Sequence, residues 1–220
     1  MPVVLEHVFK RYSDDVTALA DVSFAVNPGE LVGLLGPSGC GKSTLLNLIG
    51  CIDLPTTGRV IVAGEETARL NDDDLTRLRR DHVGTIFQFF NLLPTLTLTE
   101  NVGLPLMLAH KDGLQAGMRV RDVLERVGLT DRGSAFPATV SGGQLQRAAI
   151  ARAIVHQPAI VLADEPTGNL DSRNGDIVLK LLRELADGGQ TIIMATHSAQ
   201  AASICDRRIH LLDGAIESMT

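Results

Sequence analysis

The chain has 220 residues, and its 45% hydrophobic and 21% charged residues are typical of a folded globular protein and exclude an intrinsically disordered one. Lys and Arg number 20 against 26 Asp and Glu, a net charge of −6, so the overall basic surface of many nucleic-acid binders is absent and we expect no nucleic-acid partner. Three widely spaced cysteines, Cys40, Cys51 and Cys205, indicate a reducing compartment, for which we take the cytoplasm.

The first 65 residues alternate short strand-like runs with turns. Turn residues stand at Asn27-Pro28-Gly29 and Thr57-Gly58. The predicted strands are Val3–Phe9, Leu19–Val26, Leu31–Leu35 and Arg59–Val62. This part of the chain is therefore predicted to be rich in strands.

From about Asp72 the apolar residues recur at spacings of three and four, which predicts helices. The predicted helices are Asp72–Arg80, Val120–Val127, Gly142–His156 and Gly175–Ala186. Because the stretch from Gln88 to Gln157 has little strand signal while both flanks have it, we predict a helical insertion there. The longest apolar run, Leu45–Ile52, is far shorter than the roughly 20 residues of a membrane-spanning helix, so no span is expected. The first residues, Met-Pro-Val-Val-Leu-Glu-His, have neither a basic region nor a long apolar one, so no secretory leader is expected either.

The last predicted helix has an apolar face that must pack on a sheet. That face consists of Ile177, Val178, Leu181, Leu182 and Leu185, and Gly188-Gly189 follows as a stop. Compact apolar runs of strand length, Ala159–Ala163 and Thr191–Ala195, lie on either side of the helix, as buried parallel strands do. Strand, helix and strand in this order predict an α/β core.

Residues 36–43 match a phosphate-binding loop that lies between an apolar strand and a helix. The loop and the residue after it are Gly36, Pro37, Ser38, Gly39, Cys40, Gly41, Lys42, Ser43 and Thr44. The glycines let backbone N–H groups turn inward, and the helix starting near Lys42 adds its positive dipole end. We expect Lys42 to contact the β- and γ-phosphates and Ser43 to offer its hydroxyl to Mg²⁺.

Two adjacent carboxylates, Asp164 and Glu165, end the apolar run 159–163. Strand alternation should point them in different directions, so that Asp164 orients the metal and Glu165 polarises the attacking water. The alternative is a strand end with two solvated acids.

Two further polar side chains follow predicted strands. His197 comes directly after Thr191–Ala195 and could hold the γ-phosphate and the water, although a histidine there is also compatible with a surface or core role. Gln88 follows the apolar run Val83–Phe87, and its amide oxygen could touch Mg²⁺.

The segment Val140-Ser141-Gly142-Gly143-Gln144-Leu145-Gln146-Arg147 resembles the signature sequence of ATP-binding-cassette (ABC) ATPases. The phosphate loop, Gln88, Asp164-Glu165, the run Gly168-Asn169-Leu170-Asp171 and His197 follow the family order, so the resemblance covers essentially the whole chain. Val140 departs from the leucine that is usual in the family. Common P-loop GTPases and kinases lack this combination.

The resemblance implies one ABC ATPase domain over residues 1–220, with a fold of the α/β class. Its P-loop NTPase (RecA-like) core would comprise residues 1–87 and 158–220, with an N-terminal antiparallel β subdomain. Residues 88–157 would form the inserted helical subdomain that carries the signature.

The resemblance also implies a dimer in which the signature of one chain faces the phosphate loop of another. The expected contacts across this interface come from Ser141, Gly142, Gly143, Gln144 and Asp171. Independently of the family, a serine followed by two glycines at a helix start forms an anion-binding helix end. The partner would be a second ABC ATPase subunit, and a homodimer is expected.

Tyr12 is the one tyrosine of the chain. The family resemblance implies that its ring stacks on adenine, and the alternative is an ordinary tyrosine on the sheet surface.

Apolar residues are concentrated directly after Gln88, in the segment 89–97 with Phe87 before it. In the family this region borders a groove that receives a cytoplasmic helix of a membrane subunit. Packing of the inserted helices is the alternative explanation for these residues.

The motif set and the run from Glu165 to Ser172 are most similar to the branch with the lipoprotein-releasing, macrolide-efflux and cell-division cassettes. The expected function is an ATPase that binds ATP and Mg²⁺ and drives an integral membrane permease from the cytoplasmic face of the inner membrane. Glu165, His197 and Lys42 would be its catalytic residues. The alternatives are a regulatory ATPase that gates a cell-wall or division complex and, less favoured by the charge, a DNA-associated ABC ATPase.

Overall fold

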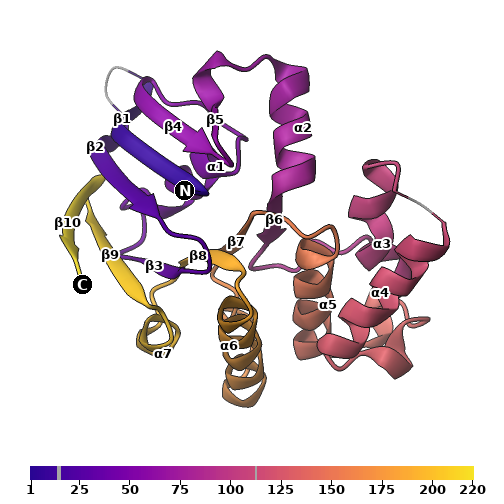
Figure 1. The fold of residues 1–220 in the computed structure, drawn as a ribbon. Helices are drawn as coiled ribbons and strands as arrows, with labels where there is room; N and C mark the ends of the chain where they lie inside the picture. The colour runs from indigo at the N-terminus through magenta and orange to yellow at the C-terminus, as the bar shows by residue number, and fades with distance from the viewer. Residues whose placement is uncertain (14–15, 112) are drawn as a thin grey trace.

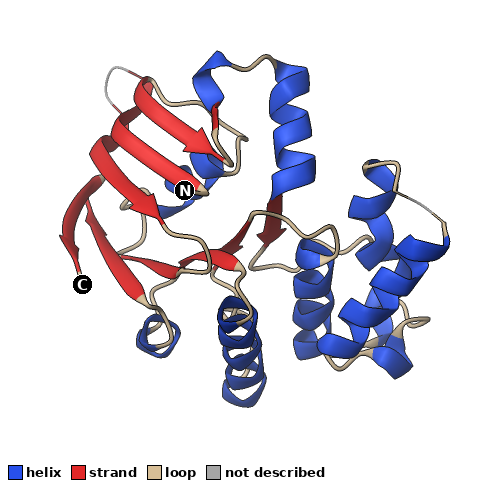
Figure 2. Ribbon diagram, in the orientation of Figure 1, coloured by secondary structure: helices blue, strands red, loops and turns tan. Residues whose placement is uncertain are grey.

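The structure is a computed structural model that describes residues 1–13, 16–111 and 113–220. It consists of two sheets and a group of helices, as Figure 1 shows. Strands occupy the part of the molecule that contains both termini, whereas α3, α4 and α5 form a helical region at the opposite end (Figure 2).

The smaller sheet has four antiparallel strands in the order β2-β1-β4-β5. The strands are β1 Val3–Ser13, β2 Val16–Val26, β4 Thr57–Val62 and β5 Glu65–Glu66. Val3, Val8 and Val22 are buried on one face, and α1 (Lys42–Ile49) lies beneath them. This antiparallel layer was expected from the resemblance, and its strands extend beyond the predicted runs.

The larger sheet has six strands in the order β10-β9-β3-β8-β7-β6. The strands are β3 Leu31–Leu35, β6 Val83–Ile86, β7 Ile160–Asp164, β8 Thr191–Ala195, β9 Arg207–Leu212 and β10 Ala215–Met219. All neighbours are parallel except β10, which pairs antiparallel with β9. Parallel strands have their carboxyl ends at one edge, so the residues that follow β3, β6, β7 and β8 meet there.

Alternate residues of the parallel strands enter two hydrophobic clusters on opposite faces of the sheet. Val161 and Met194 pack with the helices on one face, whereas Leu162 and Ile193 pack with α1 and the antiparallel sheet on the other. Burial on both faces explains why these strands read as continuous apolar runs.

The remaining helices have defined starts. They are α2 Asp72–His82, α3 Leu98–Leu108, α4 Leu114–Arg126, α5 Gly142–Ile154, α6 Ser172–Asp187 and α7 Ala199–Ser203, with short 3₁₀ turns at Thr67–Arg69, Thr130–Arg132 and Pro137–Thr139. Thr97 and Ser141 cap α3 and α5 through capping boxes, and Asp171 caps α6. Among the helices of the described residues, none has both the length and the apolar composition needed to cross a lipid bilayer.

The α/β fold class is confirmed, and two details differ from the sequence prediction. The β9–β10 hairpin was not predicted, although its turn residues Asp213-Gly214 are a strong hairpin signal. Ile177, assigned to the buried face of α6, is 42% exposed, and Leu179 is buried instead. The division at residues 88–157 stays a prediction; within the described part of that range the structure has helices and no strand.

Candidate functional site

The phosphate loop needs glycine at two positions for conformational and steric reasons. Gly36 has φ +145°, and a Cβ there would lie 2.2 Å from the carbonyl oxygen of Leu211. Gly41 has φ +104° at the N-cap of α1, where a Cβ would lie 2.7 Å from the carbonyl oxygen of Ala18. Both glycines therefore let the loop lie against neighbouring backbone while α1 begins behind it.

Lys42 begins α1 and bends back over the loop. Its ammonium donates to the carbonyl oxygens of Gly36, at 2.7 Å, and Pro37, at 2.8 Å. An ammonium held over the loop in this way is at the place where loop N–H groups and the helix dipole favour an anion.

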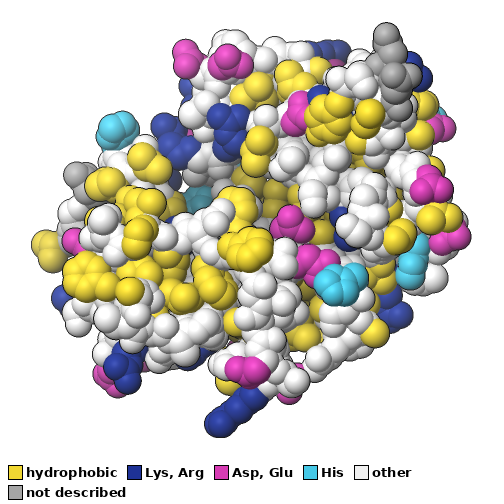
Figure 3. Space-filling model, turned by 180° about the vertical axis from the view of Figure 1, so that it is seen from behind, with side chains coloured by type: hydrophobic (Ala, Val, Ile, Leu, Met, Phe, Trp, Pro, Cys, Tyr) yellow, Lys and Arg dark blue, Asp and Glu magenta, His cyan; other side chains and the backbone are white. Residues whose placement is uncertain are grey.

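A cavity of about 650 Å³ lies over this loop at the carboxyl edge of the parallel strands. It is lined by Ala18, Ser38, Gly39, Gly41, Lys42, Ser43, Thr44, Gln88, Asp164, Glu165 and His197. The cavity thus brings together residues that the sequence analysis selected from four separate segments, and Ala18, which it did not select, completes the lining. Figure 3, seen from behind, shows acidic and histidine side chains adjoining one another on the surface.

Asp164 is the last residue of β7 and lies beside Ser43, whose hydroxyl donates to Asp164 Oδ2 at 3.4 Å. Burial, and then the nearby Glu165 charge, raise the pKa of the Asp164 carboxyl. A carboxylate lies here in a place that disfavours its charge, so we expect a cation bound beside it to stabilise the ionised form.

Glu165 does not continue the strand, because its φ is +45°. The alternation argument therefore fails at this residue: Asp164 and Glu165 both line the cavity, and the left-handed turn directs the glutamate. The backbone N–H of Glu165 donates to Ala195 O at 2.9 Å, and Thr196 Oγ1 donates to Glu165 Oε2 at 3.3 Å. These bonds attach the glutamate to the end of the neighbouring strand β8.

His197 lies over the outer side of Glu165, with its Nδ1 2.7 Å from Glu165 Oε1. Because a carboxylate only accepts, the proton is on Nδ1 when the glutamate is ionised. The histidine side chain is 73% exposed, whereas that of Glu165 is 15% exposed. The arrangement can hold a buried carboxylate in one orientation beside the phosphate loop.

Gln88 lies just beyond β6, and its backbone carbonyl accepts from Asn169 Nδ2 at 2.9 Å. Asn169 in turn lies in the run that follows Glu165, so the structure ties the segments after β6 and β7 together. Sequence reasoning did not assign a role to Asn169 or to Thr196. Thr196 directly follows β8, and Asn169 lies in the loop that follows β7, so the position of both beyond buried parallel strands was the signal that could have identified them.

The signature segment lies outside the phosphate-loop cavity in the folded chain. Ser141 accepts from the N–H of Gln144 at 3.3 Å, and Gln144 Oε1 accepts from the N–H of Ser141 at 2.9 Å, so the pair caps α5. Ser141 is exposed, and among the described residues that line the phosphate-loop cavity none belongs to 141–144. A single chain therefore does not bring the signature to its own phosphate loop.

Asp171 caps α6 by accepting from the N–H of Asn174 at 2.9 Å, and the Asn174 amide donates to its other oxygen at 2.6 Å. These bonds lower the pKa of the Asp171 carboxyl. Asp171 lines a smaller cavity of about 260 Å³ that shares Glu165 and His197 with the first one. The carboxylate lies at the outer rim of the site.

Tyr12 lies near the end of β1 and does not line the phosphate-loop cavity. The residue is 56% exposed, and its hydroxyl donates to Asp53 Oδ2 at 3.1 Å. Lys10 Nζ lies 4.9 Å from the ring centroid. The adenine contact stays a prediction. The Tyr12 ring is exposed, and the bond from its hydroxyl to Asp53 holds one edge of it in place.

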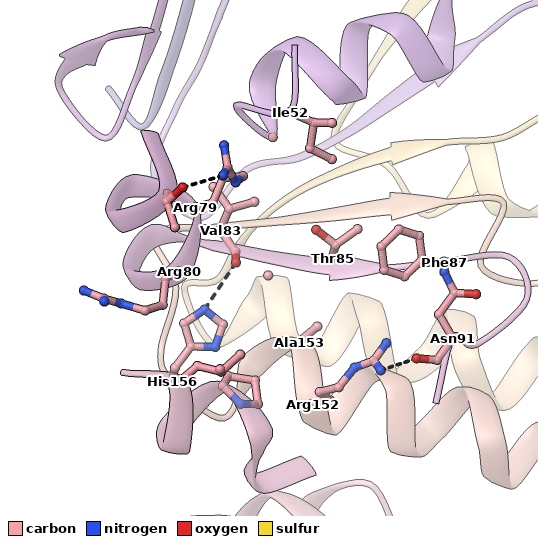
Figure 4. A pocket seen from close by; sticks show the side chains of 15 residues that line it. Ile52, Arg79, Arg80, Val83, Thr85, Phe87, Asn91, Arg152, Ala153 and His156 are labelled. Carbon is pink, nitrogen blue, oxygen red and sulfur yellow. Dashed lines mark hydrogen bonds between the residues drawn. The ribbon is translucent and has the colours of Figure 1, made fainter. Parts of the chain in front are cut away.

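A second cavity, of about 400 Å³, lies between α2, β6 and the helical region (Figure 4). Ile52, Phe87 and Leu108 contribute apolar surface to it, and Arg79, Arg80, Arg152 and His156 add basic side chains. Arg152 crosses its floor and donates to the carbonyl oxygens of Phe90 and Asn91. We call this the α2–α5 groove.

Comparison with known proteins adds a family to this geometry. The model of the ABC transporter family matches residues 19–168, which span the phosphate loop, the signature and Glu165. The chain belongs to the ABC transporter family. Membership of this family implies ATP hydrolysis, and the sequence prediction of the family is confirmed.

Individual relatives cover almost the whole chain. An ABC transporter ATP-binding protein of Mycobacterium tuberculosis, Rv0986, is 51% identical over 96% of this chain and 85% of its own length. The macrolide export ATP-binding/permease protein MacB of Burkholderia pseudomallei is 48% identical over 96% of this chain but only 33% of MacB. This match agrees with the macrolide-efflux branch that the sequence resembles, and the chain spans about a third of MacB.

A solved structure of the ATP-binding cassette MJ0796 of Methanocaldococcus jannaschii has a TM-score of 0.89 and 41% identity, covering 99% of this chain and 97% of that one. It is described as dimeric, in a post-hydrolysis state, and bound to ADP and Pi. CbiO1 of Clostridium perfringens, part of the ABC transporter complex cbiONQ, has a TM-score of 0.89 at 28% identity and covers 99% of this chain and 87% of its own. The likeness confirms the cassette fold.

Proposed function

We propose that this chain is the ATP-hydrolysing subunit of a membrane transporter, that it dimerises when ATP binds, and that it drives a permease partner. One observation carries the dimer: the described residues that line the phosphate-loop cavity include Lys42, Asp164 and Glu165 but no signature residue, whereas Ser141 is exposed at another helix end. A second copy, related by a two-fold axis, would supply the missing helix end to each site. The dimeric MJ0796 cassette supports this arrangement.

In this arrangement each ATP is held by two chains. The loop residues 36–44 bind the phosphates from one side, with Lys42 on the β- and γ-phosphates and Tyr12 on the adenine. Ser141, Gly142, Gly143 and Gln144 of the other chain contact the γ-phosphate, with Asp171 beside them. The α5 helix end suits this role, because its first N–H groups and dipole favour an anion.

Hydrolysis follows from the orientation of Glu165. Its carboxylate accepts a proton from the attacking water, whose oxygen forms a bond to the γ-phosphorus as the bond to the β–γ bridging oxygen breaks. ADP and inorganic phosphate are the products. His197 and Thr196 hold the two carboxylate oxygens, so the base is oriented before ATP binds.

The donor set beside Lys42 fits a magnesium ion. Ser43 and Asp164 are in contact, Gln88 lines the same cavity, and hydroxyl, carboxylate and amide oxygens are ligands that Mg²⁺ accepts. The described residues form no cluster of three or more His, Cys, Asp or Glu, which suits an ion that takes most of its ligands from phosphates and water. When bound, Mg²⁺ neutralises charge on the β- and γ-phosphates.

The α2–α5 groove is the proposed docking site for the permease. It combines apolar walls, including the exposed Ile52, with a floor that Arg152 ties to the backbone of Phe90 and Asn91, shortly after Gln88. A short helix of a partner fits a groove of this kind. The match to MacB, an ATP-binding/permease protein, supports a partner of the export or mechanotransmission type at the cytoplasmic face of the inner membrane.

The substitution E165Q tests this function. It keeps the size of the side chain and removes the base, so ATP turnover should fall by about 10²–10⁴-fold. ATP should then hold E165Q as a stable dimer, measured by size-exclusion chromatography with light scattering. The matched control is E184Q, at an exposed glutamate of α6, which should turn over and dissociate like the parent chain. Unchanged turnover in E165Q, or full activity in a chain that stays monomeric, contradicts the proposal.

A further inference from the structure

Gln146 is a fully buried polar side chain in the signature helix α5. Its exposed fraction is 0%, and its Nε2 donates to the carbonyl oxygen of Pro166 at 2.7 Å. Within the described residues its Oε1 has no hydrogen-bond partner. A buried amide oxygen without a hydrogen bond lowers the stability of the fold. That such an amide is nevertheless present at this position indicates that its one hydrogen bond, to Pro166, has a role.

The acceptor of this bond belongs to the turn that holds the catalytic base. Pro166 directly follows Glu165, whose φ of +45° is disfavoured for a residue with a side chain. The Glu165 N–H donates to Ala195 O at 2.9 Å, and its carbonyl accepts from the N–H of Gly168 at 3.0 Å. The bond from Gln146 fixes the next carbonyl, so it completes the restraint of the left-handed turn.

The donor of the bond belongs to the helix end that serves the other nucleotide. Gln146 lies five residues after the cap Ser141, within the first turns of α5. The same helix end packs on the segment that follows the turn. A Cβ at Gly142 would lie 3.7 Å from Leu170 Cδ2, and one at Gly143 would lie 2.1 Å from Asn174 Oδ1.

We propose that Gln146 is a positioning residue that joins the signature end of α5 to the Glu165–Pro166 turn, so that each chain couples the two nucleotide sites of the dimer. This inference rests on the proposed function. The α5 end of one chain contacts the ATP that is bound to its partner. A displacement of that helix end is passed through Gln146 to Glu165 of the same chain, beside the ATP that this chain binds. The coupling is by position, since Gln146 itself touches neither nucleotide.

The bond explains why an amide, and not an apolar side chain, occupies this place. Methionine has a similar length and would fill the volume, but it cannot donate to Pro166 O. Q146M should therefore lower kcat by 10-fold or more, leave KM for ATP within about threefold, and reduce the Hill coefficient for ATP toward 1. The matched control is I150V, a volume loss at a fully buried residue of the same helix. It should keep the kcat and the Hill coefficient of the parent chain.

The substitution Q146E separates positioning from general loss of structure. A protonated carboxyl can donate to Pro166 O as the amide does, whereas a carboxylate cannot, and burial favours the protonated form. The kcat of Q146E relative to the parent chain should therefore rise as the pH falls from 8 to 6. The same ratio for I150V should not change over this range. If Q146M does not fold, this pH profile decides the question.

The outcomes distinguish the inference from the function on which it rests. Parent-like kcat and Hill coefficient in Q146M, or a Q146E ratio that is flat with pH, overturns the role of Gln146. A parent chain that does not hydrolyse ATP, or an E165Q chain that does not dimerise with ATP, overturns the proposed function instead. Thermal melting of each variant without nucleotide verifies that it is folded.

Discussion

The carboxylate of Glu165 and the imidazole of His197 are joined by a 2.7 Å contact between Oε1 and Nδ1, although 31 residues separate them in the chain. Adjacent parallel strands explain the contact, because β7 and β8 end side by side, with Glu165 directly after β7 and His197 two residues after the end of β8. The exposed histidine thus fixes one oxygen of a base that is itself largely buried. Orientation of the base is therefore separable by mutation from its chemistry.

The first prediction concerns this pair. H197A should lower kcat by about 10²-fold because the carboxylate loses one of its two side-chain restraints. E165Q removes the base outright, so H197A added to E165Q should cause little further loss, and the two effects should not add. Steady-state ATP turnover of the two single variants and the double variant measures this coupling. Additive losses would show that His197 acts independently of Glu165.

The second prediction concerns Tyr12, whose exposed ring is held by Asp53 and Lys10. If the ring stacks on adenine, Y12A should lose about 1–3 kcal/mol of binding and raise KM for ATP by about 5- to 150-fold, with kcat nearly unchanged. Y12F keeps the ring and loses only the bond to Asp53, so it should resemble the parent chain. Equal KM values for Y12A and Y12F would leave Tyr12 as a surface tyrosine.

Local sequence pattern was sufficient for the elements whose signals are short-range. The phosphate loop follows from its glycines and Lys42, and the buried strands follow from continuous apolar runs that lie between two layers. The α6 helix was predicted from its periodicity, but the pattern placed Ile177 on the buried face. In the structure Ile177 is exposed and Leu179 is buried, because the buried face of α6 is rotated relative to the predicted stripe.

The contacts that the sequence could not predict depend on tertiary placement. The left-handed turn at Glu165 overrides strand alternation, and Gly36 needs its conformation because the β9 carbonyl of Leu211 lies against it. Likewise, the bond from Gln146 to Pro166 joins residues 20 apart whose segments meet only in the folded chain. Motif order located the candidate site, whereas the restraints within it required the structure.

The third prediction concerns Arg152, which donates to the carbonyl oxygens of Phe90 and Asn91 at the floor of the α2–α5 groove. Both of these residues have positive φ, at 62° and 50°, so the turn they form needs external restraint. R152M should lower the free energy of unfolding by about 1.5–3 kcal/mol, measured by urea denaturation. R121A on the exposed side of α4 should change it by less than about 0.5 kcal/mol. Equal effects would mean that Arg152 does not hold the turn.

The last prediction follows from the charge of Asp164. Burial and the Glu165 charge raise the pKa of this carboxyl in the folded chain above its ordinary value of 3.8. Below that value the group is protonated in both the folded and the unfolded chain and contributes nothing. As the pH rises toward neutrality the unfolded chain releases the proton more readily, so stability is lost and the loss persists at pH 7. D164N should therefore raise the melting temperature of the nucleotide-free chain at pH 7, by about 2–4 °C for each 1 kcal/mol recovered. The gain should shrink toward pH 4, and D206N, at an exposed aspartate paired with Arg183, should not reproduce it.

Magnesium-dependent ATP turnover should fall in D164N despite the greater stability, because the same charge that costs stability in the free chain is the one expected to favour the cation. A D164N chain that melts below the parent at pH 7 would show that its carboxylate is stabilising in the free state and that the electrostatic account of the site is wrong.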